Sequence, residues 1–244
     1  MNVRLDRALV ERGLVPTRAR AQAAIKAGFV RIDGAPASKA SQSVGPGAAL
    51  ALEGSDGQWV SRAALKLVGA LEAFSVRAEG AVALDIGAST GGFTQVLLQH
   101  GAAKVYAVDV GHGQLAPEIA DDARVITLEK TNAKDLTANH ISEPVNLIVS
   151  DVSFIGLEKA LPVPLSLAAK GCKLIALIKP QFEVGPGKVG KGGIVKDGRL
   201  HDEVCTRIED WLEREVGWSV KGLIDSPIEG GDGNKEFLIY AEKP

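Results

Sequence analysis

Four charged residues stand at the ends of apolar segments, where together they could move a proton. Lys179 ends the run LIALIK, and Asp151 ends VNLIVSD. Lys66 lies in the helical segment WVSRAALKLV, and Glu236 opens the last apolar run, EFLIYA. A surface salt bridge would account for any one of them alone, but two amines and two carboxylates together could bind a hydroxyl and take its proton. Because α/β sheets build sites at the carboxyl ends of their strands, we expect the four side chains to meet there.

A glycine-rich loop is the second candidate site. It follows the apolar run AVALDI and reads Asp85-Ile-Gly87-Ala-Ser89-Thr-Gly91-Gly92-Phe93. Glycines at a strand-to-helix junction let a ligand approach the backbone, and Asp109, at the end of the next strand, could accept bonds from both ribose hydroxyls of a nucleoside. The loop lacks the G-x-G-x-x-G spacing of a dinucleotide site. Asp85 suits a ligand with an ammonium and a sulfonium, which favours S-adenosylmethionine over a nicotinamide cofactor.

Three other chemistries are disfavoured. Residues 185–191 have the spacing of a phosphate-binding P-loop, but Gly192 replaces the Ser or Thr that would bind Mg²⁺, so we interpret them as a basic loop near the substrate. The turn Asp151-Val152-Ser153-Phe154 lacks the prolines typical of amino-group methylases. Cys172 and Cys205 lie in a predicted strand and helix, where a core role is expected rather than a nucleophilic one. No metal site is predicted.

Strands and helices alternate from residue 81 onward. Apolar runs predict strands at AVALDI, KVYAVDV, RVITLE, VNLIVSD and CKLIALIK, two more at GWSVKGLI and KEFLIYA, and an amphipathic helix over Arg199 to Val216. This alternation predicts a doubly wound α/β sheet. The 244 residues suffice for one such domain and a small second one.

The amino-terminal part is basic although the whole chain carries −2. Residues 1–45 hold eight Lys or Arg against three acidic residues, which gives +5. The pattern predicts a helix over 4–12, a second helix capped by Thr17 and ending near Gly28, and a strand over Phe29 to Ile32. A tight turn at Asp33-Gly34 and a returning strand over Gly47 to Leu52 complete this part. A basic head on an acidic body indicates an anionic partner, although a solvated basic surface is the alternative.

Residues 3–50 resemble the RNA-binding module named after ribosomal protein S-four. The string RLDRALVERGLVPTRARAQAAIKAGFVRIDG carries that resemblance. It implies a small α+β domain whose helix pair presents its basic face to an RNA backbone. The residues that would make these contacts are Arg4, Arg7, Arg18, Arg20 and Lys26.

The rest of the chain resembles the FtsJ-like ribose 2′-O-methyltransferases, and among them the TlyA, or haemolysin A-like, family. The strings LDIGASTGGFTQVLLQHGA, DVGHGQLA, SDVSFI, IKPQFEVG and GNKEFLIY carry the resemblance. It implies a Rossmann-like fold and a Lys-Asp-Lys-Glu tetrad at Lys66, Asp151, Lys179 and Glu236. It also implies S-adenosylmethionine contacts from Asp85, Gly87, Ser89, Gly91, Gly92, Phe93, Asp109, Asn132 and Asp151. Asn132 stands where many relatives have Asp, and Ala63 stands where the family has Gly.

We therefore expect an RNA-binding domain over residues 1–52, a linker over 53–60 and a methyltransferase domain over 61–244. The resemblance implies methylation of cytidine ribose 2′-hydroxyls in ribosomal RNA, with ribosomal RNA or ribosomal subunits as partners. Without a signal core or spanning segment, we expect a cytoplasmic protein that does not bind membranes, with a monomer as default. The alternatives are a non-catalytic RNA-binding assembly factor and a membrane-active haemolysin.

Overall fold

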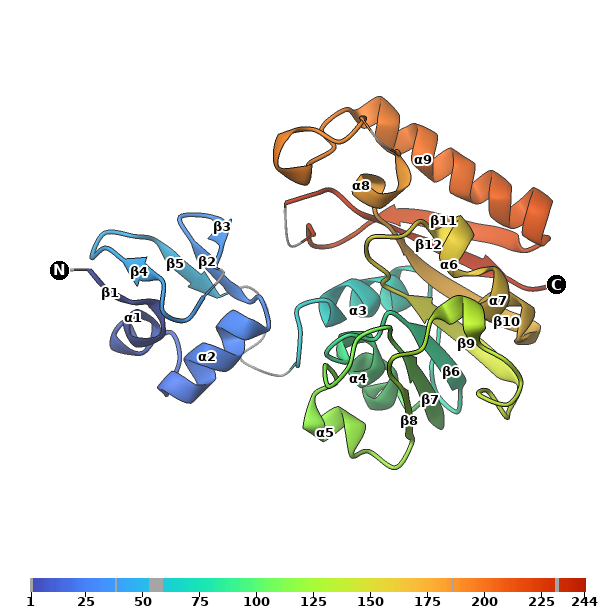
Figure 1. Cartoon of the computed structure of the whole chain (residues 1–244), viewed down its shortest axis with the longest axis horizontal. Coiled ribbons are helices and arrows are strands. Elements are labelled where there is room, and N and C mark those ends of the chain that lie inside the picture. Colours follow the sequence, from blue (N-terminus) through green and yellow to red (C-terminus); the bar gives the residue numbers. More distant parts are fainter. Residues whose placement is uncertain (1, 38, 53–58, 186, 231–232) are drawn as a thin grey trace. The chain divides into compact units, whose positions relative to one another are not determined.

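The computed structural model describes residues 2–37, 39–52, 59–185, 187–230 and 233–244. These residues form two compact units, Met1–Ala64 and Leu65–Pro244. Most of the predicted linker, residues 53–58, lies outside the described residues. Each unit has its own helices and β-sheet structure (Figure 1).

The first unit combines two short helices with small antiparallel sheets. Its elements are β1 (Val3–Arg4), α1 (Leu5–Glu11), α2 (Arg18–Lys26), β2 (Val30–Ile32), β3 (Ala35–Pro36), β4 (Ser43–Val44) and β5 (Leu50–Leu52). The strand order is β3-β2-β5, and β1 pairs with β4. The predicted Thr17 cap is present, because its hydroxyl accepts a bond from the Arg20 amide at 3.2 Å. Leu5, Leu9 and Ile25 bring the helices together in a buried core.

The second unit is built on a seven-stranded sheet with the order β11-β12-β10-β9-β6-β7-β8. Strands β6 to β10 run parallel, and β12 is antiparallel to both β10 and β11. The strands are β6 (Val82–Ile86), β7 (Lys104–Val108), β8 (Val125–Leu128), β9 (Val145–Ser150), β10 (Ala168–Ile178), β11 (Ser219–Asp225) and β12 (Phe237–Glu242). The α/β architecture expected from the sequence is confirmed, with one antiparallel strand near the edge.

Helices cover both faces of this sheet (Figure 1). They are α3 (Ala64–Ala73), α4 (Gly92–Gln99), α5 (Pro117–Ala120), α6 (Leu157–Ala160), α7 (Pro162–Ser166), α8 (Pro180–Glu183) and α9 (Gly198–Asp210), with 3₁₀ turns at Ala133–Asp135 and Lys191–Gly193. Leu84 of β6 shares one core cluster with Leu157 of α6 and Ile208 of α9. Side chains alternate along a strand, so Tyr240 of β12, which contacts Phe74 with ring centroids 5.3 Å apart, marks the opposite face, beside α3.

The predicted helix over Arg199 to Val216 exists but changes character along its length. After α9 the chain continues as one π-helical turn, Trp211–Val216, and stops at Gly217, which has a φ of +77°. Trp211 and Leu212 are buried there. A π turn changes the periodicity by one residue, and a sequence pattern of apolar positions does not resolve that change.

Candidate active site

The strand order reverses between β6 and β9, which is where α/β sheets bind ligands. The loop after β6 lies directly against the end of β9 at that point. A side chain at Gly87 would place its Cβ 3.0 Å from the carbonyl oxygen of Asp151, and the φ of Gly87 is +85°. Only glycine allows so close an approach in that backbone conformation. The glycine-rich loop and Asp151 therefore belong to one site.

Asp85 is a fully buried carboxyl at the end of β6. Its Oδ2 accepts a hydrogen bond from the hydroxyl of Thr94 at 2.7 Å, whereas its Oδ1 is buried with no partner. Burial, reinforced by the nearby charge of Asp151, raises the pKa of Asp85 to about 7. A buried carboxylate with an unpartnered oxygen is the arrangement expected where a cationic ligand binds.

Asp109, which follows β7, is hydrogen-bonded to the same loop. Its Oδ2 accepts a bond from the Ser89 amide at 2.8 Å, and its Oδ1 accepts one from the Gly111 amide at 2.7 Å. Gly91, the residue just before α4, has a φ of +94°, and a Cβ there would lie 2.9 Å from Leu115. Asp109 thus holds the loops after β6 and β7 together, and each of its oxygens keeps a lone pair for a ligand hydroxyl.

Three further residues implied as cofactor contacts take different positions. Gly92 and Phe93 are buried in the first turn of α4, so Phe93 packs into the core rather than facing solvent. Asn132 is half-buried and caps the turn Ala133–Asp135 by accepting a bond from the Lys134 amide at 3.2 Å. The carboxamide nitrogen of Asn132 remains the group that could face a ligand.

The four tetrad residues form two ion pairs. The Nζ of Lys66, on α3, lies 2.6 Å from Oε2 of Glu236, and both side chains are less than 10% exposed. The Nζ of Lys179 lies 2.5 Å from Oδ1 of Asp151. Ile178 pairs with Phe237 across β10 and β12, so Lys179 and Glu236 stand side by side at the sheet end.

Two polar residues beside the tetrad were not predicted as site residues. Ser153 accepts a hydrogen bond from Lys179 Nζ at 2.9 Å. The amide nitrogen of Gln181 lies 3.5 Å from Oε1 of Glu236, while its own oxygen is buried without a partner. Because Gln181 lies two residues after Lys179 and contacts Glu236, it connects the two ion pairs of the tetrad. Its place in IKPQF, two residues after Lys179, is the signal that could have identified it.

Phe154 is the third unpredicted feature of the site. Its side chain is 89% exposed, and its φ is +66°, a backbone conformation that a bulky residue adopts only under constraint. The ring rests on Phe182, with centroids 5.0 Å apart. An exposed aromatic ring three residues after Asp151 offers a flat surface on which a nucleobase could stack.

The cysteines and the P-loop-like segment, which the sequence disfavoured as catalytic groups, lie in the core and in a glycine-rich turn. Cys172 and Cys205 are both buried, and burial raises the pKa of each thiol to about 12, which does not suit a nucleophile. A P-loop leads directly into a helix, but Gly192 has a φ of +79° and no α-helix begins there. Residues 185–191 therefore match a P-loop in the spacing of their residues only. Within the described residues, no group of three His, Cys, Asp or Glu is placed to hold a metal ion.

The basic residues of the first unit are organised by a buried carboxylate that sequence reasoning missed. Asp6 is fully buried and accepts hydrogen bonds from Arg4, Arg18 and Gln22, each at 3.0 Å. The hydrogen bond from Arg4 is the largest of the interactions that hold the pKa of Asp6 well below its ordinary value. About half of each Arg4 and Arg18 side chain stays exposed. Asp6 therefore fixes two guanidinium groups on the outer side of the helix pair.

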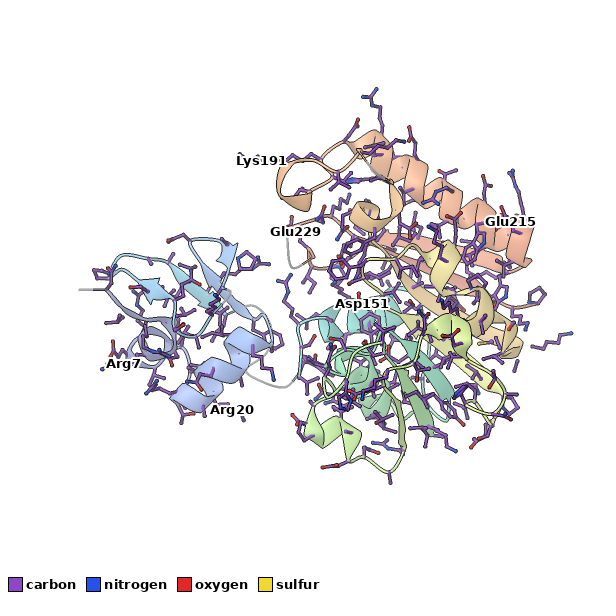
Figure 2. All side chains as sticks on the ribbon, in the orientation of Figure 1. Arg7, Arg20, Asp151, Lys191, Glu215 and Glu229 are labelled. Carbon is purple, nitrogen blue, oxygen red and sulfur yellow. The ribbon has the colours of Figure 1, made fainter. Side chains whose placement is uncertain are left out.

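The other candidate RNA contacts lie on the same two helices. Arg7 is exposed and lies 3.7 Å from Glu11, one turn further along α1. Arg20 and Lys26 are exposed on α2. Figure 2 shows Arg7 and Arg20 pointing outward from α1 and α2.

Comparison with known proteins agrees with this architecture. An S4 domain matches residues 3–50, and the FtsJ-like methyltransferase family matches residues 59–243. The chain is 47% identical to the 16S/23S rRNA (cytidine-2′-O)-methyltransferase TlyA of Mycobacterium tuberculosis, over 97% of this chain and 88% of that protein. It is 38% identical to a protein named Hemolysin A from Brachyspira hyodysenteriae, over 98% of this chain and 99% of that protein.

A solved structure is similar to nearly the whole chain. A hemolysin-named protein from Streptococcus thermophilus matches 99% of this chain and 88% of its own, with a TM-score of 0.77 and 40% identity. The match spans both the small unit and the seven-stranded sheet. Together with the sequence relatives, it establishes that this chain belongs to the TlyA family of FtsJ-like methyltransferases.

Proposed function

We propose that this protein transfers a methyl group from S-adenosylmethionine to the ribose 2′-hydroxyl of a cytidine in ribosomal RNA. The observation that carries the proposal is the pair of buried ion pairs, Lys66–Glu236 and Lys179–Asp151, at the strand ends beside the glycine-rich loop. Family membership supports the reaction class, and the name of the Mycobacterium tuberculosis relative supports the substrate. A ribosomal substrate implies that the reaction takes place in the cytoplasm.

The residues at the switch point fit S-adenosylmethionine. When bound, this cofactor supplies an electrophilic methyl group on a sulfonium. Asp85 offers a buried carboxylate oxygen without a partner to a cationic ligand, and Asp109 offers lone pairs to ribose hydroxyls. Backbone from the loop would line the remainder of the site, at Gly87, Ser89, Gly91, Gly92 and Phe93, with Asn132 and Asp151 at its edges.

The tetrad divides the work on the substrate hydroxyl between its two ion pairs. We assign removal of the 2′-hydroxyl proton to Lys179 in its unprotonated amine form, with its Nζ positioned by Asp151 and Ser153. On taking the proton, Lys179 becomes the ammonium that pairs with Asp151. The Lys66–Glu236 pair orients the hydroxyl, because a buried pair with little freedom presents a fixed donor and a fixed acceptor. Most of the rate acceleration then comes from positioning and electrostatics, since a sulfonium is already a good leaving group.

Two features suit an RNA substrate. The arginines held by Asp6 present positive charge for phosphate contacts, which position an RNA without reading its sequence. Phe154 presents an exposed ring beside the tetrad, where a base next to the reacting ribose could stack. A backbone contact in one unit and a base contact in the other together favour a polynucleotide over a free nucleoside.

The haemolysin alternative finds less support. The Brachyspira hyodysenteriae and Streptococcus thermophilus relatives carry that name. Among the described residues, however, no helix combines the length and apolar character needed to cross a bilayer. A non-catalytic assembly factor would not need the buried ion pairs, since burying charge is costly.

The direct test is methyl transfer to ribosomal RNA. Purified protein is incubated with methyl-labelled S-adenosylmethionine and ribosomal subunits from cells that lack the gene. The RNA is then digested to nucleosides, which are separated by chromatography against 2′-O-methylcytidine and base-methylated cytidine standards. We expect label in 2′-O-methylcytidine. Label only in base-methylated nucleosides, or no label with folded, cofactor-binding protein, would contradict the proposal.

A further inference from the structure

The glycine-rich segment of residues 187–194, which we call the lysine loop, has no role in the mechanism above. It connects α8 to α9 and carries Lys188 and Lys191. No acidic residue occurs between Glu183 and Asp197 in the sequence. The surroundings differ in sign, because residues 65–244 contain 19 Lys or Arg and 25 Asp or Glu, a net charge of −6. The loop is therefore a local basic feature on an acidic unit.

The lysine loop has a defined turn at its tip. The Gly190 amide donates to the Ile194 carbonyl at 3.0 Å, and the Gly193 amide donates to the Gly190 carbonyl at 3.1 Å. A Cβ at Gly190 would lie 2.8 Å from the Ile194 oxygen, so this position requires glycine. Lys191 sits at the exposed tip (Figure 2), and Lys188 is about half exposed, with its Nζ 3.8 Å from Oε2 of the exposed Glu203 on α9.

The base of the loop is bonded to a buried residue close in sequence to Glu236. Asn234 is 1% exposed, and its carboxamide accepts from the Val195 amide at 3.0 Å and donates to the Gly193 carbonyl at 2.9 Å. The buried ring of His201 lies 2.9 Å from the Val195 carbonyl oxygen. Asn234 precedes Glu236 by two residues, and the loop itself leaves the helix that begins just after Lys179. Each end of the loop thus connects to a segment close in sequence to a tetrad residue.

We propose that the lysine loop binds phosphates of the RNA chain next to the methylated nucleotide, with Lys188 and Lys191 as the contacts. The inference rests on the proposed function and adds a second RNA-binding surface, within the methyltransferase unit. A polyanion that approaches an acidic unit needs local positive charge to bring its ribose to the tetrad. Lysines on a turn anchored to Asn234, two residues before Glu236 in the sequence, supply that charge.

The test compares two double variants that each remove two positive charges. Lys188→Gln/Lys191→Gln changes the loop. Lys170→Gln/Lys221→Gln is the matched control, because both residues are exposed and lie on strands away from the tetrad end, Lys170 near the start of β10 and Lys221 in edge strand β11. RNA affinity is measured by filter binding of ribosomal subunits without cofactor, from 50 to 300 mM KCl. Methyl transfer is measured in parallel at varied subunit concentration.

We expect the loop variant to bind RNA about tenfold more weakly near 100 mM salt, and its log–log salt slope to become shallower by about 1.4 to 1.8 for two lost phosphate contacts. The KM of the loop variant for ribosomal subunits should rise, while its kcat should stay within twofold of the wild-type value. The control variant should match wild type in both binding and methyl transfer. Equal losses in both variants, or an unchanged slope in the loop variant, would overturn the proposal. Binding is read without turnover, so an enzyme that binds RNA but transfers no methyl group would refute the proposed function and leave this comparison valid.

Discussion

The unpartnered carboxyl of Asp85 gives a prediction in which stability and cofactor binding change in opposite directions. Burial raises the pKa of Asp85 from 3.8 to about 7. An acid with a raised pKa in the folded state destabilises the fold once the pH exceeds its unfolded value, and the penalty grows until the folded pKa is passed. At 1.36 kcal/mol per pH unit, the cost is close to zero near pH 3, roughly 1.7 kcal/mol at pH 5 and roughly 4 kcal/mol at pH 8.

Asp85→Asn removes that titration and keeps an oxygen to accept the Thr94 hydroxyl bond. Its buried amide adds a constant cost, so the informative quantity is the difference in unfolding free energy between variant and wild type at each pH. We expect this difference to move in favour of the variant by about 2.5 kcal/mol between pH 5 and pH 8. For a unit of this size, that corresponds to roughly 5–10 °C in Tm. Scanning calorimetry of the full chain would measure it.

Asp135→Asn is the matched control, because Asp135 is exposed. Its Tm difference from wild type, measured over the same pH range, is the baseline against which the Asp85→Asn difference is compared. The cofactor gives the second readout: wild-type affinity for S-adenosylmethionine should rise about tenfold per pH unit up to pH 7 and then level off, and Asp85→Asn should bind weakly throughout. A pH-independent Tm difference for Asp85→Asn, or wild-type affinity flat from pH 5.5 to 8, would refute the reasoning.

Three further predictions concern the tetrad, Phe154 and the first unit. Lys66→Met should lower the free energy of unfolding by about 3–5 kcal/mol, because it leaves Glu236 charged and buried. In urea titrations, the double variant Lys66→Met/Glu236→Gln should recover part of that loss. A double variant as unstable as the sum of both single variants would argue against the ion pair. Phe154→Ala should reduce kcat/KM for RNA about tenfold with cofactor affinity unchanged, and loss of cofactor affinity instead would contradict a base-stacking role. Arg20→Gln should make the salt slope of RNA binding shallower by about 1, whereas an unchanged slope would remove Arg20 from the interface.

The parts of the fold that the sequence predicted are those governed by local pattern. Continuous apolar runs marked the buried strands, and the Asp33-Gly34 dipeptide marked the turn between β2 and β3, where both residues have positive φ. The return strand expected over Gly47 to Leu52 begins only at Leu50. The two-residue strands β3 and β4 were not predicted, because they are held by partners rather than by their own pattern.

What the sequence did not predict is which distant residues contact one another and the roles that follow from those contacts. Lys66 and Glu236 are 170 positions apart, and only the fold shows which amine pairs with which carboxylate. Asp6 looked like one more charge on a helix, but its burial makes it the centre that holds Arg4 and Arg18. Asn234 had no motif of its own, and its role follows from its bonds to Gly193 and Val195.

Replacement of Lys179 tests the central claim most directly. Single-turnover methylation of ribosomal subunits by Lys179→Ala is compared with wild type, and calorimetry measures cofactor binding by both proteins. We predict that methyl transfer is lost and that cofactor affinity stays within a few-fold, because Lys179 acts on the ribose hydroxyl. Ribose methylation at the wild-type rate by folded Lys179→Ala protein would contradict the account.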